Sequence, residues 1–171
     1  MFRLEQIGIK QVQVLKDISI ETFTDTFAEA NDSTHMKEYI NNHYTLEKLT
    51  KELSHPHSEF YFIFQDSVIA GYLKINRDTA QTEHTHINSL EIERIYIRTP
   101  FKRMGLGKLL IQKASERAHA MQLDSIWLGV WEGNLQALQF YNKMGFKQSG
   151  SHSFFLGSDK QTDLILKKVL T

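Results

Sequence analysis

Gly105 and Gly107 stand in a basic turn between an apolar segment, residues 90–97, and a segment with the pattern of a helix. Glycine lets the backbone approach a ligand closely, and the first N–H groups of a helix lack internal partners while its dipole adds partial positive charge. Such a turn binds phosphate or pyrophosphate. The mononucleotide and dinucleotide motifs do not fit, because Lys102 and Leu110 stand where they require glycine. A lone Gly-x-Gly is better explained as a tight turn before an amphipathic helix.

A second motif reads Asn-Leu-Gln-Ala-Leu-Gln-Phe-Tyr-Asn-Lys-Met-Gly-Phe at residues 134–146, after a short apolar segment, 126–131. Together the two motifs resemble the signatures of the GCN5-related N-acetyltransferase (GNAT) superfamily, Gln/Arg-x-x-Gly-x-Gly/Ala and Asn-x-x-Ala-x-x-Phe-Tyr-x-Lys-x-Gly-Phe. Residues 20–27, 90–97, 126–132 and 161–165 make the chain most similar to the PaiA-type spermidine/spermine N-acetyltransferases. The resemblance spans nearly the whole chain and departs at Lys102, where the family usually has Gln or Arg.

The resemblance implies both a fold and a co-substrate. In the superfamily the fourth and fifth strands splay apart, acetyl-CoA lies in the gap, and the acetyl group passes directly to an amine through a tetrahedral intermediate. Backbone groups of the fourth strand bind the pantetheine arm and meet the oxyanion, and those of the turn bind the pyrophosphate. Carried over by position, these contacts are Ile95, Tyr96, Ile97, Lys102, Arg103, Met104, Gly105, Leu106, Gly107 and Lys108. No metal is expected.

Glu91 and Glu93 are the candidate bases. A primary amine with a pKa near 10 is almost fully protonated at pH 7, and forming the neutral nucleophile costs roughly 4 kcal/mol. The two glutamates alternate with Leu90 and Ile92, so both should lie on one face of the strand, beside the expected thioester. We expect Glu93 to accept the proton, directly or through a water, with Glu91 as the second choice. Solvent-facing charges and ion pairs with Arg94 are equally good explanations.

Tyr141 is the candidate acid. The resemblance places it beside the sulfur of CoA, where a phenol with an ordinary pKa of about 10 stays protonated and can donate to the leaving thiolate. Periodicity alone would instead predict packing against Phe140 and Phe146. Asn134 should cap the helix and, within the family, also touches the pantetheine arm. Lys143 is either a contact to the cofactor phosphates or an ordinary solvated lysine.

Acidic and aromatic side chains are the candidates for binding the acceptor. A polyamine is a string of ammonium groups, and its site requires spaced carboxylates with aromatic or methylene walls. The candidate residues are Glu21, Asp25, Glu29, Glu132, Asp163 and His152, with Tyr39 and Trp131 as walls. An exposed acidic helix face explains the first three equally well, and strand packing explains His152. The polyamine itself follows from the resemblance alone; another amine, such as a protein N-terminus, a lysine or a small-molecule amine, and a non-catalytic CoA-binding regulator are the alternatives.

Composition excludes several other classes of function. The 20 Lys and Arg balance 20 Asp and Glu, which argues against the basic face that nucleic-acid binding requires. Because the chain has no cysteine, disulfides, a cysteine nucleophile and thiolate metal ligands are excluded. No apolar run approaches the roughly 20 residues of a membrane span and no signal peptide is evident, which predicts a cytoplasmic protein. A homodimer is expected from family habit only.

The elements that position these residues predict one domain, residues 1–171, of the α/β (α+β) class. Strands are expected at 2–7, 60–64, 68–75, 90–97, 125–131, 146–155 and 162–169, and helices at about 12–27, 36–53, 105–121 and 135–144. Polar residues 78–88 predict a loop or a frayed strand end. The order predicts one mixed, mostly antiparallel, twisted sheet of about seven strands flanked by helices, with a left-handed helix cap at Gly145.

Overall fold

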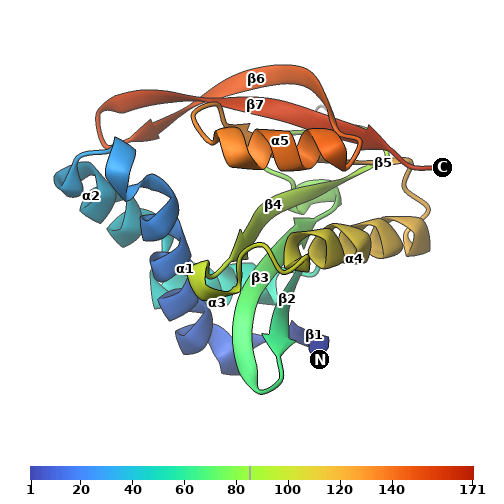
Figure 1. Ribbon diagram of the computed structural model, residues 1–171, viewed down its shortest axis with the longest axis horizontal. Helices are drawn as coiled ribbons and strands as arrows, with labels where there is room; N and C mark the ends of the chain where they lie inside the picture. Colours follow the sequence, from blue (N-terminus) through green and yellow to red (C-terminus); the bar gives the residue numbers. More distant parts are fainter. Residues whose placement is uncertain (85) are drawn as a thin grey trace.

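A single seven-stranded sheet forms the centre of the molecule (Figure 1). The computed structural model describes residues 1–84 and 86–171. The strands, in the spatial order β1-β2-β3-β4-β5-β7-β6, are β1 (Phe2–Ile7), β2 (Ser58–Gln65), β3 (Val68–Asn76), β4 (Ser89–Ile97), β5 (Ser125–Trp131), β6 (Lys147–Leu156) and β7 (Asp159–Val169). The helices are α1 (Val12–Phe27), α2 (Ser33–His43), α3 (Leu46–Ser54), α4 (Leu106–Ala120) and α5 (Leu135–Lys143). Among the described residues only β4 and β5 pair in parallel, which confirms the mixed, mostly antiparallel sheet.

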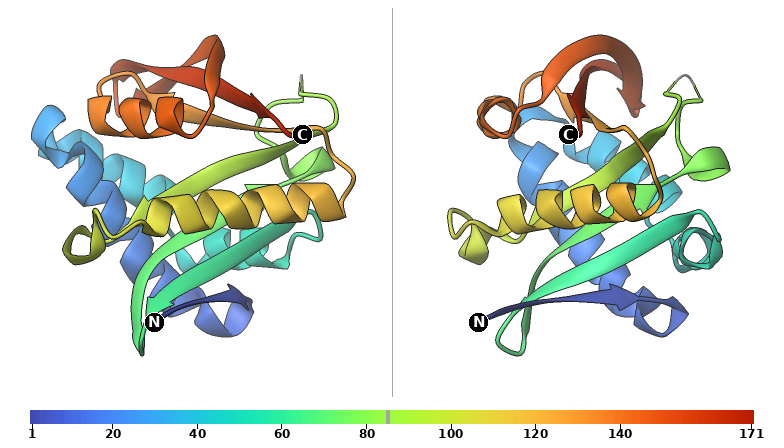
Figure 2. Two further views of the ribbon diagram at one scale, coloured as in Figure 1. Left: turned by 45° about the vertical axis from the view of Figure 1, so that its right-hand side comes forward. Right: turned by 90° about the vertical axis from the view of Figure 1, so that its right-hand side faces the viewer.

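The alternation of side chains along the strands divides the core into two layers. On one face of the sheet, Leu90 and Ile92 of β4 belong to the core that packs with α4 and α5. On the other face, Phe60, Phe62 and Tyr72 belong to the core that packs with α1, α2 and α3. Figure 2 shows the two groups of helices on opposite sides of the sheet. The molecule is therefore a three-layer arrangement of helices, sheet and helices.

The two central strands separate along their length. Their parallel pairing runs from Ser89 with Ser125 to Ile92 with Leu128, and the described pairing between them ends there. Beyond that point β4 remains paired with β3, as far as Ile97, and β5 remains paired with β7. The predicted splay is thus confirmed, and Figure 1 shows β4 diverging from β5. Backbone N–H and C=O groups on the facing edges become available to a ligand, as on an exposed sheet edge.

A β-bulge at Glu93 changes which residues of β4 share a face. β3 pairs Lys74 with Arg94 and Ile75 with Ile92, so Glu93 is the extra residue. Strict alternation would place Glu93 and Arg94 on opposite faces. With the bulge, both lie on the face covered by α1, α2 and α3, where Arg94 pairs with the α3 residue Glu52.

The helical region expected at 36–53 forms two helices, and a side-chain cap begins each of them. The Asp32 carboxylate accepts hydrogen bonds from the N–H groups of Thr34 and His35 at the start of α2, and Thr45 Oγ1 accepts from the Lys48 N–H at the start of α3. The other expected elements are present, with ends that differ by a few residues. Gly145 has the predicted left-handed φ, 94°. In the expected loop at 78–88, Thr85 lies outside the described residues.

No helix in the described chain is long and apolar enough to cross a membrane.

Candidate active site

A cleft of about 1380 Å³ opens where β4 and β5 separate. One end is lined by the turn that follows β4 and by α5. The other end lies on the face covered by α1, α2 and α3 and holds most of the ionisable side chains of the cleft; we call it the polar chamber. The ionisable residues of the polar chamber are His43, Lys48, Glu52, Lys74, Glu83, Glu91, Glu93, Arg94, His152 and Asp163. The diverging half of β4 joins the two ends.

The turn between β4 and α4 exposes backbone N–H groups. Arg103 and Gly105 have positive φ values of 66° and 82°, and α4 begins immediately afterwards. Left-handed residues of this kind turn successive amides toward one side and form an anion-binding concavity. A Cβ at Gly105 would meet open space, so glycine is needed there for its positive φ. At Gly107 glycine is needed for close packing, because a Cβ there would lie 3.1 Å from the ring of Phe140. The second glycine therefore holds α4 close to α5.

Tyr141 reaches the cleft from α5. Its ring packs edge-on against Phe140 and Phe146, with centroids 5.2 and 5.6 Å apart. Burial raises the pKa of its phenol, so the group stays protonated at neutral pH and is available as a proton donor. Packing in the core and exposure to the cleft, which were alternatives in the sequence, occur together.

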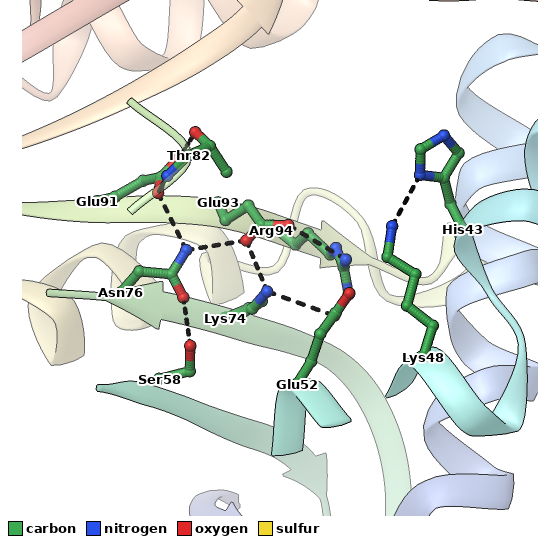
Figure 3. A network of polar contacts seen from close by, with 10 residues as sticks. All are labelled: His43, Lys48, Glu52, Ser58, Lys74, Asn76, Thr82, Glu91, Glu93 and Arg94. Atoms are coloured by element: carbon green, nitrogen blue, oxygen red, sulfur yellow. Dashed lines mark hydrogen bonds and ion pairs between the residues drawn. The ribbon is translucent and has the colours of Figure 1, made fainter. Parts of the chain in front are cut away.

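Two carboxylates and two cations form a closed ion-pair quartet in the polar chamber (Figure 3). The Lys74 Nζ atom lies 2.6 Å from Glu93 Oε1 and 3.3 Å from Glu52 Oε1. The Arg94 guanidinium lies 2.9 Å from Glu52 Oε1 and 3.1 Å from Glu93 Oε2. Because the four residues come from α3, β3 and β4, the quartet ties three elements together. Glu93 is thus an ion-pair partner of Arg94.

This quartet makes Glu93 a weak base. Burial raises the pKa of Glu93, but the positive charges of Arg94 and Lys74 outweigh burial and lower it to about 2. A carboxylate with such a pKa holds a proton only in strong acid. The surroundings of Glu93 therefore do not favour the prediction from sequence that Glu93, rather than Glu91, is the base.

Glu91 has a different environment from its neighbour. Burial raises the pKa of Glu91, and hydrogen bonds from Asn76 and Thr82 oppose the effect without cancelling it. Asn76 Nδ2 donates to Glu91 at 3.0 Å and to Glu93 at 2.8 Å, so the two carboxylates share one face as their alternation predicts. Of the two, Glu91 is the better proton acceptor near neutral pH.

Comparison with known proteins identifies the family. Residues 15–146 match the profile described as Acetyltransferase (GNAT) family. The chain belongs to this family. It is 42% identical, over 98% of its length and 97% of the relative's, to an uncharacterised N-acetyltransferase in the pepI 3′ region of Lactobacillus delbrueckii subsp. lactis.

Two further similarities involve Thermoplasma acidophilum. The GNAT chain is 23% identical over 148 residues, 84% of its length and 87% of the relative's, to the spermidine N(1)-acetyltransferase of that organism. The solved structure of its PaiA N-acetyltransferase in complex with coenzyme A matches with a TM-score of 0.82 at 22% identity, covering 99% of both chains. The predicted superfamily and the GNAT fold are therefore confirmed.

The residues of the two GNAT motifs gather at one end of the cleft. Those that line it are Ile95, Tyr96, Ile97, Lys102, Arg103, Gly105, Leu106, Gly107, Lys108, Asn134, Tyr141 and Lys143. Met104 is exposed and does not line it. Asn134 Oδ1 accepts a hydrogen bond from the Ala137 N–H at 3.2 Å, which is the expected helix cap.

The predicted acceptor residues separate into two groups. Glu21 is bound by Arg98 at 2.8 Å and Asp25 accepts from Thr99 at 3.0 Å, and neither these two nor Glu29 and Glu132 line the cleft. For Glu21 and Asp25 the reason is that α1 turns its apolar residues, including Phe23 and Phe27, toward the cleft. The predicted residues that do line it are His152, Asp163, Tyr39 and Trp131.

Sequence reasoning missed most of the polar chamber. His152 and Asp163 were among the predicted residues, but Glu83 was not. His152 lies between the two carboxylates, with Nδ1 against Glu83 and Nε2 3.2 Å from Asp163. Glu83 lies in a loop and Lys48 on a polar helix, where charged residues carry no signal of function. Lys74 does carry a signal in the sequence, because a lysine inside the apolar run 68–75 requires charged or polar partners when it is buried. No group of three side chains able to hold a metal ion occurs in the described chain.

Proposed function

We propose that the protein transfers an acetyl group from acetyl-CoA to a primary amine. The observation that carries the proposal is one continuous cleft that joins the anion-binding turn at Gly105 to the polar chamber through the diverging half of β4. An extended arm that ends in a thioester requires this combination, since its diphosphate needs N–H donors and its pantetheine amides need strand edges. The turn and the strand edge fit those groups.

The transfer requires one proton to be removed and another to be supplied. The amine nitrogen attacks the thioester carbonyl, an N–C bond forms, and the C–S bond breaks. We assign the removal of the amine proton to Glu91, directly or through a water, and the protonation of the leaving thiolate to Tyr141. Glu93 then serves as a positioning residue, because it orients Asn76, which also donates to Glu91. Solvent exchange restores both groups.

Two classes of acceptor fit different parts of the polar chamber. A polyamine such as spermidine is the first. It is supported by the similarity to the spermidine N(1)-acetyltransferase of T. acidophilum and by the carboxylates of Glu83 and Asp163, which line the cleft together with Trp131. An amine that carries a carboxylate is the second, and Lys48 is the specific observation that favours it.

The proposal is tested by measuring thiol release from acetyl-CoA against a panel of amines, with mass spectrometry of the products. We expect at least one amine to be N-acetylated with one thiol released per acetyl group. Glu91→Gln should lower turnover by about 10²–10⁴-fold, and Glu93→Gln, assayed below its melting temperature, should lower it less. Equal losses in the two variants would remove Glu91 from the role of base. If the protein binds CoA but acetylates no amine, it is a CoA-binding protein and the proposed activity is wrong.

A further inference from the structure

Lys48 brings an ammonium group to the polar chamber (Figure 3). It lies in the first turn of α3, where its N–H is bound by the Thr45 cap. Its Nζ atom lies 3.1 Å from Nδ1 of His43, at the end of α2. An ammonium group can only donate, so Nδ1 of His43 accepts and the ring proton is on Nε2. The pair therefore offers donors on both groups and no negative charge.

The His43 ring is held in place and kept neutral. It stacks on Tyr39, with centroids 4.0 Å apart and an angle of 30° between the rings, and Tyr39 stacks in turn on Phe23. Burial lowers the pKa of His43, and the charges of Lys48 and Arg94 lower it further. His43 thus orients Lys48 without adding a second charge.

The carboxylates of the polar chamber already have partners within the protein. Glu52 and Glu93 are shared between Lys74 and Arg94 in the quartet. Glu83 and Asp163 flank His152, and Glu91 accepts from Asn76 and Thr82. Within the described residues, by contrast, no carboxylate lies within ion-pair distance of Lys48, whose polar side-chain contact is the neutral His43. Lys48 is therefore a cation of the polar chamber that no carboxylate of the described residues neutralises.

We infer that Lys48, oriented by His43, binds an anionic group of the acceptor, most simply a carboxylate. The acceptor is then an amine that also carries a carboxylate, as amino acids and peptides do. This inference rests on the proposed acetyl transfer and decides between its two acceptor classes in favour of the second. A second ammonium group at Lys48 would meet a like charge, which is costly away from bulk water.

The test compares amines that differ only at the far end. For each chain length from two to six carbons, kcat/KM is measured for the ω-amino acid, for the alkylamine and for the diamine. Hydrogen bonds to charged groups contribute roughly 1.5–3 kcal/mol, so at the best length the ω-amino acid should exceed the alkylamine by about 10- to 100-fold. The diamine should not exceed the alkylamine.

Variants of α3 locate the effect. Lys48→Met removes the charge at similar length and should reduce the ratio of ω-amino acid to alkylamine to near one, while Lys48→Arg should keep most of it. Lys51→Met is the matched control, because Lys51 is three residues further along the same helix, 77% exposed, and pairs with Glu47 at 3.5 Å. Its ratio should equal that of the unaltered protein. An unchanged ratio in Lys48→Met, or a diamine preferred over the ω-amino acid, would overturn the inference.

Binding measured without turnover separates this inference from the proposed function. Calorimetry of the CoA-bound protein compares N-acetylated ω-amino acids with the uncharged N-alkylacetamides of equal length. We expect tighter binding of the anionic compounds, by about tenfold or more, and loss of that difference in Lys48→Met. Equal binding of both compounds overturns the anion site. If the difference is present but no amine is acetylated, the anion site stands and the proposed transfer fails.

Discussion

Replacing Glu93 by glutamine tests whether the negative charge of Glu93 stabilises the fold by balancing the cations of the quartet, rather than acting in catalysis. The substitution keeps the shape of the side chain and an oxygen that can accept from Lys74 and Asn76, but it removes the negative charge. Two cations, Lys74 and Arg94, then share one carboxylate, Glu52. Both cations are less than one-tenth exposed, so water cannot replace the lost charge.

Two routes give the same magnitude for the loss of stability. Removing one partner of a buried ion pair costs about 3–5 kcal/mol, and the retained hydrogen bonds place Glu93→Gln at the lower end, about 3 kcal/mol. The pKa of Glu93 falls from its ordinary value of 4.5 to about 2, and at 1.36 kcal/mol for each unit this also corresponds to about 3 kcal/mol. For a domain of this size the melting temperature should fall by about 6–12 °C.

The effect should depend on pH with a definite sign. Because the folded pKa of Glu93 is depressed, its contribution is fully present above the unfolded value and is lost as the pH falls through the folded value. The difference between the unaltered protein and Glu93→Gln should therefore be constant near neutral pH and should shrink between about pH 5 and pH 2.

Urea unfolding followed by fluorescence, at a series of pH values, measures this difference. Glu52→Gln is the matched control, since Glu52 contacts the same two cations from α3 and should cost a similar amount. If Glu93→Gln unfolds at the same urea concentration as the unaltered protein at pH 7 while Glu52→Gln is destabilised, the charge of Glu93 does not balance the cations and the reasoning is wrong.

Three further predictions concern the GNAT motifs. Tyr141→Phe should lower kcat by about 10²–10⁴-fold while calorimetry finds CoA affinity nearly unchanged, and undiminished turnover would remove Tyr141 from the mechanism. Asn134→Ala should reduce the free energy of unfolding by about 1 kcal/mol through loss of the α5 cap, while Asn134→Ser should restore most of it; equal stability of the two would argue against the cap. Gly105→Ala should cost about 1–2 kcal/mol in unfolding experiments because of its φ of 82°, and a neutral result would contradict the left-handed turn.

The fold and the end of the cleft that the two GNAT motifs line were predictable because their signals are local. Gly105 precedes a helix and Asn134 caps one, so a short motif places each in its structure. Splaying of β4 and β5 followed from the family resemblance, and no pattern within the strands indicates it. The break between α2 and α3 was missed because it depends on side-chain caps in a polar segment, where the spacing of apolar residues gives no boundary between helices.

The polar chamber was much less predictable, because it is assembled by tertiary contacts. The bulge at Glu93 is a property of pairing with β3, and it alone brings Arg94 onto the face of the glutamates. Glu21 and Asp25 follow a helical spacing that indicates a shared stripe, but the apolar stripe of α1, with Phe23 and Phe27, is the one that faces the cleft. Periodicity alone therefore indicates that Glu21 and Asp25 lie away from the stripe of α1 that faces the cleft.

The proposed acetyl transfer requires that the cleft bring a CoA thioester to a primary amine. Its most direct test follows thiol release and the mass of the amine product in a single reaction of the purified protein with acetyl-CoA and the amine panel. We expect one thiol to be released for each N-acetyl group formed, with the acetyl group on a primary amine. Hydrolysis of acetyl-CoA without an acetylated amine, or CoA binding without thiol release for every amine in the panel, would contradict it.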